Sequence, residues 1–411
     1  MIKEIFLPEK IGDYYLFSKR IVGIDIGKTH INAVLVYMRG KTITIERCIE
    51  EKIENGTAAN HDERIIAALR IIFEQIGSYD AVYTTLSSSL VVFKELKLPF
   101  LSREKIEMVV NFEVEPLLPF PLQDAVVDFI ITKQVPEEKS SEILVAAVQK
   151  KHIVHCLEIF GQAKILVDKV IVDFFALYSL YKRIPIYNQL RGSVVLIDFG
   201  FQSIRIAYLF DGQLRLIRTI NQGISHIAIT LSNILHISRS EAMDYIIRFG
   251  LEKTDWPEYT QAVTETLTEF WKTVNFTFSS FIVQTPESSI NKIFLLGDGG
   301  QIKGLSSFIS TLLQVSVEIF DSGLIIQDKE IKLASKHMIA NTCTTALSVA
   351  LPSPIIKYFN FRRNEFQIVD HTLLIKQLIM TFLLTSVLVI MLFSFYIMQI
   401  KKLSREVYDS E

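Results

Sequence analysis

Apolar and polar residues alternate in the same order in two separate stretches of the chain. In residues 21–48 an apolar run ends at Asp25-Ile-Gly27, and a second apolar run, a glycine turn and a third run follow. Residues 194–220 repeat this order, with Asp198-Phe-Gly200 after the first run and an Asp-Gly turn after the second. Because an Asp-Gly turn between apolar runs is a strong hairpin signal, each stretch predicts a three-stranded meander. The chain is therefore predicted to be internally duplicated.

The residues between and after the meanders show helical or strand periodicity. We expect helices at 61–76, 102–115, 150–163, 173–180, 224–235, 238–249, 260–283 and 302–313, and further strands at 81–86, 90–98, 125–133, 142–148, 165–172 and 292–296. The elements at about 87–164 interrupt the first half and form an inserted subdomain. The predicted halves are 18–192 and 193–353, and the mixture of strands and helices places the chain in the α/β class.

The C-terminal region has a different pattern. From Leu378 to Met398 there is no charged residue, while Lys376 precedes this stretch and Lys401-Lys402 follows it. About twenty apolar residues make a helix that matches the bilayer core, so we predict a transmembrane helix at 377–400. The alternative is a buried helix of a soluble domain, but few residues follow to cover it. The same reading gives a juxtamembrane linker at 354–376 and a short tail at 401–411.

Composition excludes several classes of function. The formal net charge of −2 shows no basic excess, so nucleic acid is not an expected partner. The three cysteines are odd in number and far apart, which argues against a disulfide framework and suits a cytoplasmic domain. The first twenty residues are interrupted by charges and predict no signal peptide. Charges on the two sides of the apolar stretch balance, so the expected cytoplasmic location of the domain sets the orientation instead.

Three glycine turns suggest chemistry. In Asp25-Ile-Gly27 and Asp198-Phe-Gly200 a glycine follows a strand end, where backbone N–H groups can approach a phosphate without a side chain intervening. The two aspartates are of the type that holds a magnesium ion at such a phosphate. The turn Gly297-Asp-Gly299-Gly300 leaves a strand and enters a helix, where a nucleoside or its α-phosphate would rest. The other interpretation is that the aspartates only cap turns.

These turns carry a resemblance to a known superfamily. Asp25-Ile-Gly27-Lys28-Thr29, Asp198-Phe-Gly200-Phe-Gln202-Ser203 and Gly297-Asp-Gly299-Gly300 resemble the two phosphate loops and the adenosine loop of actin and Hsp70 ATPases. Within that superfamily the chain resembles the type IV pilus assembly protein PilM family and its counterpart in type II secretion, the general secretion pathway protein L. A more specific sign is Glu113-Val-Glu115-Pro-Leu-Leu-Pro119-Phe120, which resembles an element peculiar to PilM-like proteins. The resemblance covers roughly residues 18–352.

The resemblance implies an actin-like ATPase fold, with two Ribonuclease-H-like halves around a nucleotide cleft, plus the C-terminal transmembrane helix. It also implies ATP and Mg²⁺ as cofactors. The implied cofactor-binding residues are Asp25, Gly27, Lys28, Thr29, Gly200, Gln202, Ser203, Glu241, Gly297, Gly299 and Gly300. Asp25 and Asp198 would hold Mg²⁺, and Asp198 would be the catalytic residue that positions the attacking water.

The sequence departs from the family pattern in its loops. Asn32 stands where many actin-like first loops have a lysine, and Phe201 and Gln202 stand where the second loop has small residues. Asp298 replaces a glycine and Ile246 replaces a lysine; the first of these adds a negative charge near the nucleotide. The departures predict weak nucleotide binding or none. The sequence leaves open whether the protein is an enzyme and favours the answer that it is not.

The segment before the apolar helix carries a second resemblance. Asn360-Phe361-Arg362 and the residues after it resemble the start of the pilus protein PilN, so the chain reads as a fusion of the two parts. These three residues are the candidate partner-binding residues. Two interpretations are open, that Arg362 and Arg363 simply lie at the membrane surface or that the segment from Asn360 to Phe366 docks in a groove on this or a neighbouring subunit, and the first is slightly favoured.

The sequence thus predicts a single-pass protein of the bacterial inner membrane, with most of the chain cytoplasmic. Its expected function is an actin-like scaffold of a type IV pilus or type II secretion platform. Expected partners are PilN- and PilO-like membrane subunits, a cytoplasmic assembly ATPase and a second copy of the chain. The alternative is an active ATPase that uses cleft closure as a switch, in the same or a cell-division complex. Cell-division actin homologues attach by a short amphipathic helix, a pattern that is absent here.

Overall fold

A computed structural model describes residues 10–11, 14–53, 61–252, 255–282, 289–334, 341–352, 359–368 and 371–408. The chain divides into two compact units, which are considered separately. The main unit consists of Arg20–Tyr37 and Ile43–Gln367, and the helix unit of Met1–Lys19, Met38–Thr42 and Ile368–Glu411.

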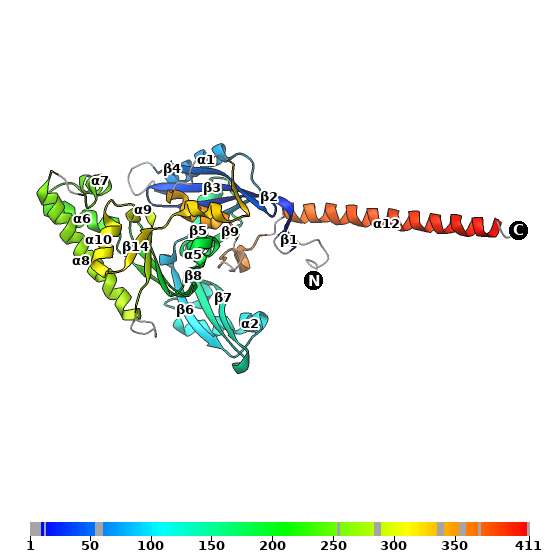
Figure 1. Ribbon diagram of the computed structural model, residues 1–411, viewed down its shortest axis with the longest axis horizontal. Helices are drawn as coiled ribbons and strands as arrows, with labels where there is room; N and C mark the ends of the chain where they lie inside the picture. Colours follow the sequence, from blue (N-terminus) through cyan, green and yellow to red (C-terminus); the bar gives the residue numbers. More distant parts are fainter. Residues whose placement is uncertain are drawn as a thin grey trace. The chain divides into compact units, whose positions relative to one another are not determined.

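The first half is organised around a sheet with the strand order β15-β4-β3-β2-β5-β9, in which β1 also pairs with β2 (Figure 1). The strands are β1 (Lys10–Ile11), β2 (Tyr14–Ile26), β3 (His30–Gly40), β4 (Thr42–Lys52), β5 (Ala81–Leu86), β9 (Lys169–Val172) and β15 (Ile331–Leu333). β2, β5 and β9 run parallel. Because β9 is the last strand in the order, it is an edge strand. The helices of this half are α1 (His61–Ile76), α3 (Lys150–Gln162), α4 (Asp173–Arg183), α5 (Pro185–Asn188) and α11 (Thr344–Ala350).

The second half repeats this arrangement in a sheet with the order β12-β11-β10-β13-β14. Its strands are β10 (Ser193–Phe199), β11 (Ile204–Phe210), β12 (Gln213–Ile220), β13 (Lys292–Leu296) and β14 (Ser316–Ile319). In each sheet a three-stranded meander is extended on the side of its first strand by a later, parallel strand. The predicted duplication is therefore confirmed.

One face of the second sheet is covered by helices that are packed around large apolar side chains (Figure 1). These helices are α6 (Ile224–Leu235), α7 (Arg239–Phe249), α8 (Pro257–Ile282) and α10 (Leu305–Leu313), while α9 (Gly297–Gly300) is one short turn. Trp271 of α8 is completely buried and meets the Phe199 ring edge-on. This packing fixes the end of β10, where one of the glycine turns begins.

A separate small sheet lies within the region predicted as an insertion. β6 (Val91–Leu98), β7 (Ala125–Val135) and β8 (Ser140–Gln149) form an antiparallel sheet in the order β6-β8-β7. The helix α2 (Arg103–Val114) buries Ile106, Val110 and Val114 against it, at the spacing of one helix face. Ser102 caps α2 by accepting a hydrogen bond from the backbone N–H of Lys105.

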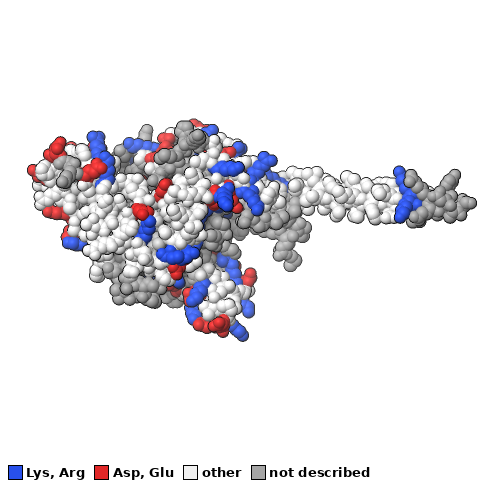
Figure 2. All heavy atoms as spheres, viewed as in Figure 1, with Lys and Arg blue, Asp and Glu red and all other residues white. Residues whose placement is uncertain are grey.

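The helix unit contains α12 (His371–Tyr408). Its stretch Ile375–Lys402 has a mean hydropathy of 2.5, and none of it is buried within the chain. Figure 2 shows the surface of this helix uncharged along most of its length, with basic residues toward its C-terminal end. By length and composition α12 is long enough to cross a membrane.

Candidate functional site

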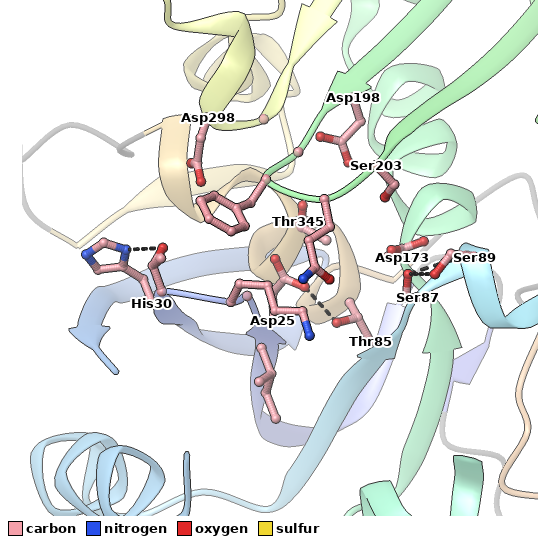
Figure 3. Close-up of a pocket in the computed structure, with 18 of the residues that line it drawn as sticks. Asp25, His30, Thr85, Ser87, Ser89, Asp173, Asp198, Ser203, Asp298 and Thr345 are labelled. Carbon is pink, nitrogen blue, oxygen red and sulfur yellow. Dashed lines mark hydrogen bonds between the residues drawn. The ribbon is translucent and has the colours of Figure 1, made fainter. Parts of the chain in front are cut away.

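The three glycine turns line one cavity of about 950 Å³, which is bordered by elements of both halves (Figure 3). The predicted residues that line it are Asp25, Gly27, Lys28, Thr29, Asp198, Gly200, Gln202, Ser203 and Gly297. The structure therefore brings together turns that are far apart in the sequence. A cavity of this size is within the range of small-molecule and cofactor sites.

Three predicted residues do not line the cavity. Gly299 and Gly300 are buried beneath the third turn, where an added Cβ would meet Phe199 and Leu295 respectively. Glu241 is at the N-terminus of α7, where its carboxylate accepts a hydrogen bond of 2.9 Å from the backbone N–H of Ser238. With the reciprocal bond from Glu241 N–H to Ser238 Oγ this completes a capping box.

The first two turns have the same backbone geometry. The N–H of Gly27 donates to the carbonyl of His30 at 2.9 Å, and the N–H of Gly200 donates to the carbonyl of Ser203 at 3.0 Å. An added Cβ would lie 2.9 Å from the His30 carbonyl oxygen at Gly27 and 3.1 Å from the Ser203 carbonyl oxygen at Gly200. A side chain would therefore crowd the hairpin closure in both halves, more at Gly27 than at Gly200, and the N–H of each glycine is used by the turn itself.

Asp25 lies at the end of β2 and accepts a hydrogen bond of 2.7 Å from the Thr85 hydroxyl at the end of β5 (Figure 3). Burial raises the pKa of Asp25, and the Thr85 hydrogen bond and the positive charge of Arg205 oppose that rise. Asp298 also lines the cavity, and burial raises its pKa as well. The cavity wall is therefore rich in carboxyl groups that are partly removed from water.

An ion network on the cavity wall joins Asp198, Asp173 and Arg205. Arg205 lies opposite Asp198 in the β10–β11 ladder and forms ion pairs with Asp198 through Nη2 and with Asp173 through Nη1. Asp198 and Asp173 are each 2% exposed. Burial raises the pKa of Asp198 to about 6, although Arg205 opposes that shift. Asp173 begins α4, so the guanidinium connects the first half to the second.

Sequence reasoning missed Thr85, Asp173 and Arg205. Thr85 is the next-to-last residue of β5, as Asp25 is of β2, and Asp173 directly follows β9, so a search for polar residues at strand ends would have found them. Arg205 stands between apolar residues in a strand, and such a buried cation calls for a carboxylate partner. Its two partners come from separate elements, which the sequence pattern does not reveal.

A second candidate site lies at the edge strand β9. The N–H of Phe361 donates to the carbonyl of Val170 at 2.9 Å, and the N–H of Val170 donates to Asn360 Oδ1 at 3.2 Å. Asn360 also forms an antiparallel bridge with Ile171. The segment thus covers the open edge of the sheet as an added strand would.

Side chains on both sides of this bridge hold the segment. Phe359 and Phe361 are completely buried, and the Phe359 ring meets Phe175 edge-on at 4.7 Å. Asp128 of β7 accepts from the N–H of Asn360 at 3.0 Å and forms an ion pair with Arg363. The favoured interpretation placed Arg362 and Arg363 at the membrane surface, whereas in the structure the segment docks on its own chain, as the alternative stated. Arg362 donates to the Val167 carbonyl, and Arg363 pairs with Asp128.

The fold and the three turns around one cleft define an actin-like ATPase fold, as predicted. A sequence model described as "Type IV pilus assembly protein PilM" matches residues 23–352, more than half of the 411-residue chain. The chain therefore belongs to the PilM family of type IV pilus assembly proteins. Among curated proteins, none matches the chain.

Solved structures are similar to this fold. The "PilM-PilN type IV pilus biogenesis complex" aligns with a TM-score of 0.68 at 19% identity, over 80% of this chain and 97% of that one. The cytoplasmic domain of EpsL, an inner membrane component of the type II secretion system of Vibrio cholerae, aligns over 85% and 100% (TM-score 0.40, 10% identity). MreB5 of Spiroplasma citri bound to ADP aligns over 76% and 95% (TM-score 0.43, 11% identity). The first of these supports the fold assignment.

Proposed function

We propose that this protein is a membrane-anchored scaffold of the inner-membrane platform of a type IV pilus. The observation that carries the proposal is the docking of residues 359–366 on β9 and Asp128, a short distance in sequence before α12. A domain of the PilM family and a long apolar helix are thereby joined in one chain through a docked segment. Membership of the PilM family supports the assignment to a pilus rather than a secretion system.

The partners follow from this arrangement. A solved PilM-PilN complex supports a PilN-like partner, and we extend this to PilO-like membrane subunits, a cytoplasmic assembly ATPase and a second copy of the chain. The test is capture of the full tagged chain from detergent-solubilised membranes of cells that make it. Recovery of membrane subunits of the platform is the expected result. Recovery of the chain alone at native expression, with α12 intact, contradicts the scaffold function.

Removing the apolar character of α12 is expected to release the protein from membranes. Leu388 and Leu392 are 57% and 60% exposed on this helix, and each arginine near the centre of a span costs about 2.5–3.5 kcal/mol. The Leu388→Arg/Leu392→Arg variant should move from the membrane pellet to the supernatant in an alkaline carbonate wash. The Leu388→Val/Leu392→Val variant, as the control, should stay in the pellet. Retention of the arginine variant in the pellet would count against a spanning helix.

The alternative function is an ATPase switch, which the cavity between the halves favours. For the full chain in detergent we expect no binding heat at millimolar Mg-ATP, because six carboxyl groups border the cavity (Asp25, Glu50, Asp62, Asp173, Asp198 and Asp298). Isothermal titration calorimetry with the unaltered chain and with Asp198→Asn tests this. Heat that is present in the first and lost in the second would establish a live nucleotide site and favour the switch.

A further inference from the structure

Two carboxylates on the wall of this cleft, those of Asp198 and Asp173, form ion pairs with Arg205. Asp198 lies at the end of β10 and Asp173 at the start of α4, and Arg205 from β11 reaches both with separate Nη atoms. The Arg205 side chain is 17% exposed, while those of Asp198 and Asp173 are 2% and 3% exposed. The positive charge is thus enclosed on the inner wall of the cavity.

These residues do not suit Mg²⁺. The ion requires nearly octahedral oxygen ligands at about 2.0–2.1 Å. Here Asp173 Oδ2 already accepts a hydrogen bond from the guanidinium, and Asp198 Oδ2 is ion-paired with it. A guanidinium stays protonated at any pH at which the protein remains folded. Arg205 therefore keeps its positive charge and cannot leave the carboxylates to a metal ion by deprotonation. A divalent cation at the same carboxylates would therefore meet a fixed positive charge at close range.

Arg205 also connects the two halves, as a metal ion bound between their carboxylates would. Asp173 belongs to the first half and Asp198 to the second, so the guanidinium bridges the two sides of the cleft. Asp25 adds a third carboxylate whose pKa responds to the charge of Arg205. One cation from the chain itself therefore neutralises and connects groups that would otherwise repel one another.

We propose that Arg205 replaces the divalent cation of the cleft, so that the two halves are held together without metal and Mg²⁺ is excluded. This inference rests on the proposed scaffold function, in which the cleft is a structural joint. It predicts that removal of Arg205 uncovers a cation site formed by Asp25, Asp173 and Asp198. The metal-binding expectation for Asp25 and Asp198 would then hold only for the variant.

The experiment titrates Mn²⁺ into the full chain in detergent and follows the free-ion signal by electron paramagnetic resonance. The unaltered chain is expected to bind no Mn²⁺ at millimolar concentration. Arg205→Ser is expected to bind one ion per chain. Without metal its Tm should fall by at least about 5 °C, since a buried ion network loses its cation, and Mn²⁺ should restore part of that loss.

Two matched variants sharpen the test. Arg205→Lys keeps the positive charge and should exclude Mn²⁺ as the unaltered chain does. Arg215→Ser removes an exposed cation of the neighbouring strand β12, outside the cavity lining, and should leave the Tm and Mn²⁺ response unchanged.

Two results would overturn the inference. One is Mn²⁺ binding by the unaltered chain that is lost in Asp198→Asn, and the other is a folded Arg205→Ser variant that does not respond to Mn²⁺. If Arg205→Ser does not fold, the titrations of the unaltered chain and of Arg205→Lys still decide whether the cation site is closed. Membrane retention and capture of platform subunits are read separately, so failure of the scaffold function is distinguishable from failure of this inference.

Discussion

Replacing Asp128 with alanine is expected to release residues 359–368 from the surface of the main unit. One carboxylate accepts the backbone N–H of Asn360 through Oδ2 and pairs with Arg363 through Oδ1, while Arg103 approaches it at 3.8 Å. Asp128 is 5% exposed, so its removal leaves the Asn360 N–H without its acceptor in a largely dry site and leaves Arg363 with Glu107 as its remaining ion-pair partner. Breaking such a pair costs about 3 kcal/mol or more.

The measurement is hydrogen exchange of the peptide that covers 359–368 in the full chain. The amide of Phe361 is protected by its bond to the Val170 carbonyl, and we expect its exchange to accelerate by about 100-fold when the segment is released. Asp124→Ala is the control, since Asp124 is exposed just before the same strand β7. Equal protection in the two variants would mean that the β9 bridge and the two phenylalanines hold the segment without Asp128.

The same segment explains why one part of the candidate site escaped sequence reasoning. The bond from Val170 N–H to Asn360 joins residues 190 positions apart, and that from Asn360 N–H to Asp128 joins residues 232 apart. Charge and polarity around Arg362 and Arg363 are equally typical of a membrane surface and of a docked strand. The choice depends on the acceptors on β7 and β9, and no local pattern contains that information.

Local patterns did suffice for the duplicated core. The meanders depend on alternation within one stretch and on Asp-Gly and glycine turns, so their strands, their adjacency and their turns could all be predicted. The short elements β14, β15 and α11 were missed, because a few residues give no measurable period.

The strand expected at 165–172 shows how tertiary context shortens an element. In the structure pairing begins at Lys169. Lys164 has a left-handed backbone (φ of 62°), the N–H of Ile165 returns to Phe160 at the end of α3, and Leu166 is 62% exposed. The apolar residues before Asp168 therefore close a helix end rather than extend the sheet.

Replacing Gly297 with alanine is expected to destabilise the main unit by about 3 kcal/mol, because two costs combine at this position. Its φ of +75° is left-handed, which costs an alanine about 1 kcal/mol. An added Cβ would also lie 2.3 Å from Asp198 Oδ1 and 2.8 Å from the carbonyl oxygen of Phe199, so the end of β10 has to move. Overpacking of this kind adds about 1–3 kcal/mol.

Gly77 supplies a matched control for the backbone cost. It has almost the same φ, +78°, but an added Cβ would have no neighbour within 4 Å. Gly77→Ala should therefore lower the free energy of unfolding of the full chain, measured in urea, by only about 1 kcal/mol. The difference between the two variants in this free energy measures the contact with Asp198. Equal losses would show that the third turn can shift away from β10 freely. A larger loss at Gly297 means that the third turn is packed directly on the carboxylate that Arg205 holds, so that strain in the turn reaches the joint between the two halves.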